Sequence, residues 1–201
     1  GVRQAWIFLV VLSLIGLLVL AQFNRTTILL GVASLALVAV YPFMKRITWW
    51  PQAWLGLTFN WGALMGYSSV TGEISAPALL LYASGVAWTL GYDTIYAHQD
   101  KEDDALVGVK SAARRLGAKT KPALTGFYGA ALVLAALAYL LSGAPPAGLL
   151  LFVIAAAHFR WQIKAANIDD PQSCLTVFRT NRDAGLLLLA PFLLAAVLAQ
   201  V

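Results

Sequence analysis

The chain has 201 residues, of which 60% are hydrophobic and only 11% charged, and its formal net charge is +5. A soluble domain carries about twice this charged fraction and could not bury so much apolar surface in one core. The single cysteine, Cys174, excludes an internal disulfide framework. The cationic side chains stand in short connections between apolar runs, which favours a membrane protein over one that binds nucleic acid.

Seven apolar segments are long enough to cross a bilayer as helices, because one span needs about 20 residues. Proline stands at the start of several, where its fixed φ suits the first helical turn. We therefore predict an all-α, polytopic transmembrane bundle in which residues 1–201 form one domain. The segments cover approximately Ala5–Phe23, Thr27–Met44, Pro51–Val70, Pro77–Tyr96, Pro122–Leu141, Pro145–Ile163 and Ala184–Val201.

The basic residues indicate how the bundle is oriented, because loops on the cytoplasmic side of a membrane are rich in Lys and Arg. Thirteen of the 14 basic residues fall at the N-terminus or in one set of alternate connections, and only Arg25 falls in the other set. We expect the long loops to face the cytoplasm of a bacterium, or the matrix if the protein lies in the mitochondrial inner membrane. The chain begins Gly-Val-Arg-Gln without Met, and we expect it to be part of a longer protein.

The stretch YDTIYAHQDKEDD holds five of the nine acidic residues. If a helix continues through it from the fourth segment, Asp100 and Asp104 project within roughly 20° of Asp93. Carboxylates without His or Cys partners suit a hard cation, Mg²⁺ above all. The alternative is the beginning of a solvated loop, in which the acids only cap a helix or solubilise the chain. It fits Glu102 and Asp103, but it fits poorly an acid that lies at membrane depth, as Asp93 does.

Basic and polar residues near this stretch are candidates for substrate binding. Lys110 and Arg114 follow the acids in GVKSAARRLG, and Lys45 and Arg46 leave the second segment on the same membrane side. Such cations could bind a diphosphate, although the positive-inside rule also accounts for basic residues here. Asn60, inside the third segment, either joins helices through hydrogen bonds or contacts substrate.

Together, YDTIYAHQDKEDD and GVKSAARRLG resemble the UbiA-type membrane prenyltransferases. The stretch YPFMKRITWWPQAWLGLTFNWGALMGY and the WQI pattern after His158 are similar to the branch of that family that prenylates 4-hydroxybenzoate in ubiquinone biosynthesis. The resemblance extends over essentially the whole chain. It implies nine helices around a central cavity with two Asp-rich motifs. The second motif matches Asp93, Asp100 and Asp104, whereas the first, Asn-Asp-x-x-Asp, has no match here. We therefore expect this chain to hold the last seven helices and to be inactive alone.

The resemblance also implies a chemistry and its partners. Asp93, Asp100 and Asp104 would be catalytic and would hold Mg²⁺, which binds the diphosphate of a polyprenyl diphosphate. Lys110, Arg114, Lys45 and Arg46 would bind the diphosphate or the carboxylate of 4-hydroxybenzoate. Tyr96, together with Tyr92, would shield an allylic cation, and membrane lipid would surround the bundle. The alternatives are a haem or chlorophyll branch of the family, or a membrane transporter with ionisable residues in its spans.

Overall fold

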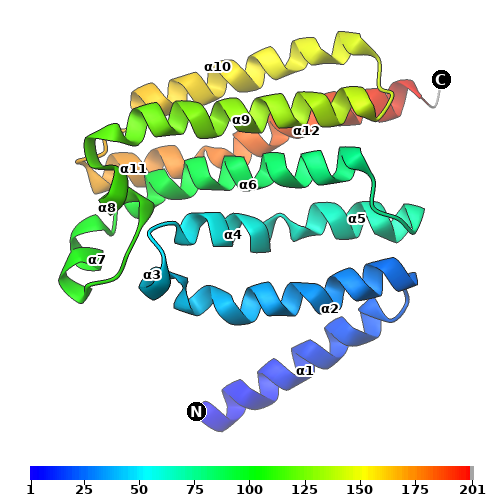
Figure 1. Ribbon diagram of the computed structural model, residues 1–201, viewed down its shortest axis with the longest axis horizontal. Helices are drawn as coiled ribbons and strands as arrows, with labels where there is room; N and C mark the ends of the chain where they lie inside the picture. Colours follow the sequence, from blue (N-terminus) through cyan, green and yellow to red (C-terminus); the bar gives the residue numbers. More distant parts are fainter. Residues whose placement is uncertain (200–201) are drawn as a thin grey trace.

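The protein is described by a computed structural model that covers residues 1–199. Helices account for the secondary structure of these residues, and no strand occurs among them. Figure 1 shows the long helices side by side, with the N-terminus and the end of α12 near opposite ends of the molecule. The helices are α1 (Val2–Leu20), α2 (Arg25–Val40), η1 (Tyr41–Phe43), α3 (Met44–Ile47), α4 (Pro51–Phe59), α5 (Trp61–Thr71), α6 (Ala76–Ala97), α7 (Lys101–Val107), α8 (Ala112–Leu116), η2 (Gly117–Lys119), α9 (Thr120–Leu141), η3 (Pro146–Gly148), α10 (Leu149–Ala165), α11 (Pro171–Arg179) and α12 (Asn181–Leu198).

The predicted apolar segments coincide with α1, α2, the α4–α5 pair, α6, α9, α10 and α12. The last segment extends to residues 200–201, which lie outside the described residues. Short helices α3, α7 and α8 gather at one end of the bundle, and the α1–α2, α5–α6 and α9–α10 connections lie at the other (Figure 1). The alternate connections that carry most of the basic residues therefore share one end, as the sequence predicts.

Five helical stretches of the described chain are long and apolar enough to cross a membrane. They are Val2–Leu20, Arg25–Ile47, Ala112–Leu141, Pro146–Ala165 and Pro171–Leu198. The other two predicted spans fall on the interrupted α4–α5 pair and on α6, which carries Asp93. The polytopic, all-helical fold is thus confirmed, while the number of seven spans stays a prediction.

The third predicted span is two helices joined at Asn60. The Asn60 Nδ2 atom donates to the carbonyl oxygen of Gly56 and to Oγ1 of Thr89 in α6, both at 2.8 Å. Gly85 of α6 lies against the same amide, and a Cβ atom at that position would overlap the Asn60 side chain. The polar contact therefore joins the α4–α5 pair closely to α6.

The interior of the bundle forms where α6 packs against α9. Gly91 of α6 lies directly against the ring of Tyr128 in α9, which in turn stacks on Phe159 of α10 at 4.2 Å between ring centroids. Ile95 and Leu124 complete this core and are fully buried. By contrast, α1 meets α2 near their connection and diverges from it toward the N-terminus, and none of its residues is buried.

The prediction of one continuous helix from the fourth segment through the acidic stretch is wrong. Helix α6 ends at Ala97, a turn follows, and Asp100 is the N-terminal cap residue of α7. Figure 1 shows α7 leaving the direction of α6 and lying beside α8. The chain turns because this segment is bound to α3: the Lys110 amide donates to the Lys45 carbonyl oxygen at 2.7 Å. Tertiary contacts therefore decide where the acidic residues lie.

Candidate functional site

Asp93 lines a small cavity at the end of the bundle that holds the long loops. The cavity has a volume of about 120 Å³ and is lined by residues from four elements, among them Tyr41, Lys45 and Gln52. Because Asp93 is in the last turns of α6, its carboxylate reaches this cavity from the membrane side. Lys45 and Asp100 are the charged side chains that interact electrostatically with the Asp93 carboxylate. The deepest acid of the stretch thus faces a polar hollow and a cation.

Lys45 connects two of the predicted acids. Its ammonium group lies 3.1 Å from Oδ1 of Asp104 in α7, and it also lines the cavity of Asp93. The side chain of Asp104 is only 8% exposed, while that of Lys45 is 48% exposed. The second carboxylate oxygen of Asp104 is buried and has no hydrogen-bond partner among the described residues. This oxygen is therefore a buried acceptor without a partner, on the residue that pairs with Lys45.

Lys110 and Arg114, which follow the acidic stretch, both lie near the ring of Trp49. The guanidinium carbon of Arg114 lies 5.5 Å from the ring centroid of Trp49, and the ammonium of Lys110 lies 6.0 Å from it. These are cation–π distances. Lys110 also donates to the carbonyl oxygen of Ile47 at 3.0 Å, and Arg114 donates to that of Asp104 at 3.3 Å. The α7–α8 loop and the α3–α4 connection therefore form one structural unit.

Gln52 is a residue of this site that the sequence analysis did not single out. It is 2% exposed, and its Oε1 accepts a hydrogen bond at 3.1 Å from the amide of Ala112 at the start of α8. Its only signal in the sequence is an uncharged amide directly after Pro51, within the motif that carries the resemblance. This buried amide joins the start of α8 to α4, although the two residues are 60 positions apart in the sequence.

An aromatic row follows one face of α6 toward the same end of the bundle. Trp88, Tyr92 and Tyr96 are spaced one helical turn apart, so they share a face. Phe178 of α11 packs on Tyr92 and Tyr96 with centroid distances of 5.8 and 4.8 Å, and Trp88 contacts Tyr92 at 5.4 Å. The predicted residue Tyr96 therefore belongs to an aromatic wall between α6 and α11.

The remaining candidates are less closely connected. Arg46 is exposed beside Lys45, and its side chain makes no hydrogen bond or ion pair among residues 1–199. The side chain of Asp100 does not cap α7. Nowhere in residues 1–199 do three or more His, Cys, Asp or Glu side chains lie close enough to hold a metal ion by themselves. The structure thus brings Asp93, Asp104, Lys45, Lys110 and Arg114 together, and Asn60 contacts α6 one turn before Asp93.

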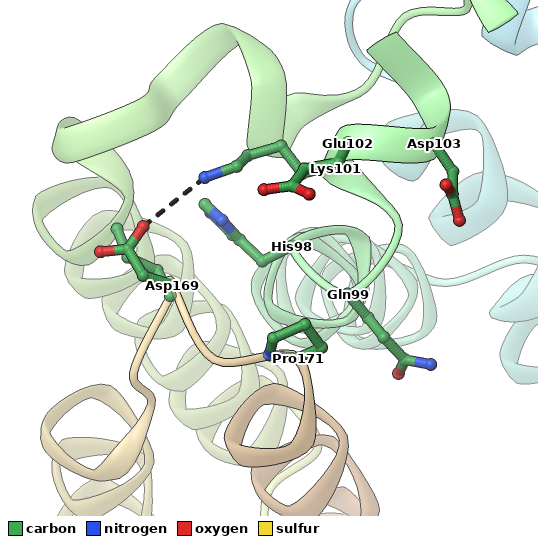
Figure 2. A pocket seen from close by; sticks show the side chains of 8 residues that line it. His98, Gln99, Lys101, Glu102, Asp103, Asp169 and Pro171 are labelled. Carbon is green, nitrogen blue, oxygen red and sulfur yellow. Dashed lines mark ion pairs between the residues drawn. The ribbon is translucent and has the colours of Figure 1, made fainter. Parts of the chain in front are cut away.

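A second polar pocket, of about 310 Å³, lies beside the acidic stretch. Figure 2 shows Lys101 reaching across His98 to Asp169, with an ammonium-to-carboxylate distance of 3.6 Å. Burial, and then the nearby Lys101 ammonium, lower the pKa of His98 below its usual value, so this imidazole is neutral at neutral pH. Glu102 and Asp103 line this pocket and not that of Asp93.

The Lys45–Asp104 ion pair should hold α7 against α3. In Lys45→Met, the buried Asp104 carboxylate loses its cation, and we expect the α7 amides to exchange with deuterium about fivefold faster, equivalent to about 1 kcal/mol. The matched control is Arg46→Met, which removes the same charge from the next residue. Hydrogen–deuterium exchange followed by mass spectrometry measures both. Equal protection of α7 in the two variants would show that the ion pair does not hold the loop.

Comparison with known proteins shows which family this chain resembles. Residues 1–189 match the UbiA prenyltransferase family. A protein of Aedes aegypti named 4-hydroxybenzoate polyprenyltransferase, mitochondrial, is 48% identical and aligns with 92% of this chain and 42% of its own length. The protein of the same name from Drosophila melanogaster is 47% identical, with 97% of this chain and 50% of that protein aligned. This chain therefore spans about half the length of the curated relatives it matches.

A solved structure has the same fold. The apo structure of a UbiA homolog from Aeropyrum pernix K1 superposes with a TM-score of 0.78 and covers 96% of this chain and 73% of that chain, at 24% identity. At this identity the likeness shows the fold alone. The sequence match over residues 1–189, the relatives near 48% identity and the shared helical architecture agree, and the chain belongs to the UbiA prenyltransferase family.

Proposed function

We propose that the full-length protein transfers a polyprenyl group from polyprenyl diphosphate to the ring of 4-hydroxybenzoate, as a step of ubiquinone biosynthesis. The observation that carries the proposal is the identity of 47–48% to proteins named for this activity, over 92–97% of the chain. The geometry supports it, because Asp93 and Lys45 line one polar cavity at the end of an apolar bundle, and Lys45 pairs with Asp104, which has a carboxylate oxygen without a partner among residues 1–199. The proposal includes a location in the mitochondrial or bacterial inner membrane, with this cavity on the matrix or cytoplasmic side.

We further propose that Asp93, Asp100 and Asp104 contribute ligands to Mg²⁺. The donor set is made only of oxygen atoms, and Asp104 has an oxygen with no partner among the described residues, which fits a hard cation. Three ligands are not grouped in residues 1–199, but Mg²⁺ is usually held by one or two carboxylates together with substrate phosphates and water. When bound, the ion would neutralise charge on the diphosphate.

In this reaction the bond between C1 of the allylic chain and the diphosphate oxygen breaks, and the electron pair leaves with the diphosphate. Lys45, Lys110 and Arg114 would bind the diphosphate and stabilise the charge that develops on it. The ring carbon ortho to the hydroxyl group of 4-hydroxybenzoate then bonds to C1, and the ring loses a proton to water. Arg46, exposed beside Lys45, would pair with the carboxylate of the acceptor.

Two further residues have proposed positions along the apolar part of the substrate. Tyr96 and the aromatic wall would lie beside the allylic cation, where ring faces attract positive charge and exclude water. Asn60 contacts Thr89, which lies one turn before Asp93 on α6, and it lines a largely apolar cavity of about 290 Å³ with Trp88. We propose that this cavity receives the start of the polyprenyl chain.

The test is an acceptor assay on the full-length protein in membranes, with polyprenyl diphosphate and Mg²⁺. We expect 4-hydroxybenzoate to be prenylated at least tenfold faster than a haem or a chlorin, with product measured by chromatography and mass spectrometry. Prenylation of the tetrapyrroles with neglect of 4-hydroxybenzoate would place the protein in another branch of its family. Ion-driven flux across proteoliposomes without bond formation would instead support a transporter.

A further inference from the structure

A groove on the outer side of the bundle, away from the Asp93 cavity, has no part in the proposed reaction. It lies between α9 and α10 and has a volume of about 350 Å³. Thr125, Gly129 and Leu132 of α9 line one side of it, and Ala156, Arg160 and Lys164 of α10 line the other.

The groove is apolar along its length and has small residues on both walls. The stacked rings of Tyr128 and Phe159 also line it and are buried in the bundle. A Cβ atom added to Gly129 would meet nothing within 4 Å, so the space beside this glycine is open. The groove lining extends over two turns of each helix, about 12 Å along α10. A flexible hydrocarbon chain fits such a space better than a polar ligand does.

Two cations stand at the end of the groove that shares the membrane side of the long loops. Arg160 and Lys164 are one helical turn apart on α10 and are both exposed. Among residues 1–199, neither side chain has an ion pair or a hydrogen bond. On α9, Lys121 lies one turn before Thr125 and therefore on the same helix face. The positive-inside rule explains the membrane side of these charges but not their position at the mouth of a groove.

From this charge complementarity we infer that the α9–α10 groove binds an anionic phospholipid of the adjacent leaflet. The phosphate lies between Arg160 and Lys164, and one acyl chain occupies the groove beside Gly129 and Ala156. Basic residues that flank a pocket between membrane helices on this side are suited to anionic headgroups. The site is separate from the proposed reaction, so it stands or falls independently of that proposal.

Native mass spectrometry of the purified full-length protein, titrated with phosphatidylglycerol, tests the charged end of the site. Arg160→Gln/Lys164→Gln should weaken retention of the first lipid on the order of thirtyfold, from two charges near the membrane surface. The matched control is Arg3→Gln/Arg179→Gln, which removes two exposed charges on the same membrane side but outside the groove, and it should bind as the unaltered protein does. Equal losses in the two double variants would overturn the inference.

A second pair of variants tests the acyl end without changing charge. Gly129→Leu fills the open space of the groove and should displace the lipid, whereas Gly126→Leu, which is also free of contacts but does not line the groove, should not. Inorganic phosphate at millimolar concentration should leave the lipid bound, and phosphatidylcholine should bind at least tenfold more weakly. Displacement by free phosphate, equal binding of phosphatidylcholine, or no effect of Gly129→Leu would each contradict a phospholipid site. Circular dichroism of every variant confirms that it is folded.

Discussion

Asp93→Ala in the full-length protein should abolish prenyl transfer, with kcat/KM falling on the order of a thousandfold or more. Asp93 reaches the polar cavity from the end of α6, where Lys45 and Gln52 line the opposite walls. Alanine removes the carboxylate at the deepest point of the proposed cation site. It leaves no overpacked neighbour, because the side chain becomes smaller. Initial rates with saturating Mg²⁺ and 4-hydroxybenzoate measure the effect.

The control for Asp93→Ala is Glu102→Ala. Glu102 belongs to the same acidic stretch and carries the same charge, but it lines the pocket of His98 and Asp169 on another side of the loop (Figure 2). We expect its activity to stay within about twofold of the unaltered enzyme, as for an exposed side chain outside the site. If Asp93→Ala keeps near-normal activity while helix content and Tm are unchanged, the assignment of Asp93 as a metal ligand is wrong.

Gly91→Ala should destabilise the bundle by about 1–3 kcal/mol, because it overpacks the interface between α6 and α9. A Cβ atom at Gly91 would overlap the ring of Tyr128, which is 1% exposed and stacked on Phe159, so the ring could move only by disturbing this stacking. Close approach of helices at glycine is a common way of packing in membranes. Thermal unfolding in detergent, followed by circular dichroism, should show a lower Tm.

Gly126→Ala is the matched control for the packing prediction. Gly126 lies on α9, two residues before Tyr128, and an added Cβ there meets nothing within 4 Å. Alanine should therefore leave stability unchanged or raise it by about 0.5–1 kcal/mol, since it restricts the unfolded chain and favours the helix. A Tm for Gly91→Ala as high as that of Gly126→Ala would show that the α6–α9 interface relaxes around the new methyl group.

The sequence was sufficient to predict most of the fold. Apolar runs such as Thr27–Met44 and Pro122–Leu141 coincide closely with α2 and α9. Lipid hydrocarbon surrounds each span, so the span must be helical and apolar along its whole length, and this is visible in the sequence. It did not predict that the third segment divides at Asn60. Asparagine inside an apolar run carries no helix-breaking signal as strong as proline, and its hydrogen bond to Thr89 arises only when α6 packs beside it.

The candidate site was predicted in part. The concentration of acids at the end of the fourth segment indicated that Asp93 and Asp104 belong to the site. The basic residues around Lys45 indicated the second segment that contributes to it, and in the structure Lys45 pairs with Asp104. Their geometry was not predictable from helical periodicity, because α6 ends at Ala97 without a glycine or proline there. The pairing of Lys45 with Asp104 spans 59 residues and follows from tertiary packing, which no local pattern encodes.

The contact between Asn60 and Thr89 also fixes how α6 can rotate. If α6 turned by one residue, the hydrogen bond between the Asn60 amide and the Thr89 hydroxyl would break, and such a bond contributes about 0.5–1.5 kcal/mol. Thr89 precedes Asp93 by one turn, about 5.4 Å along the helix axis. The hydrogen bond between these two uncharged side chains therefore constrains, inside the membrane, the direction in which Asp93 points, before any substrate or ion reaches the surface.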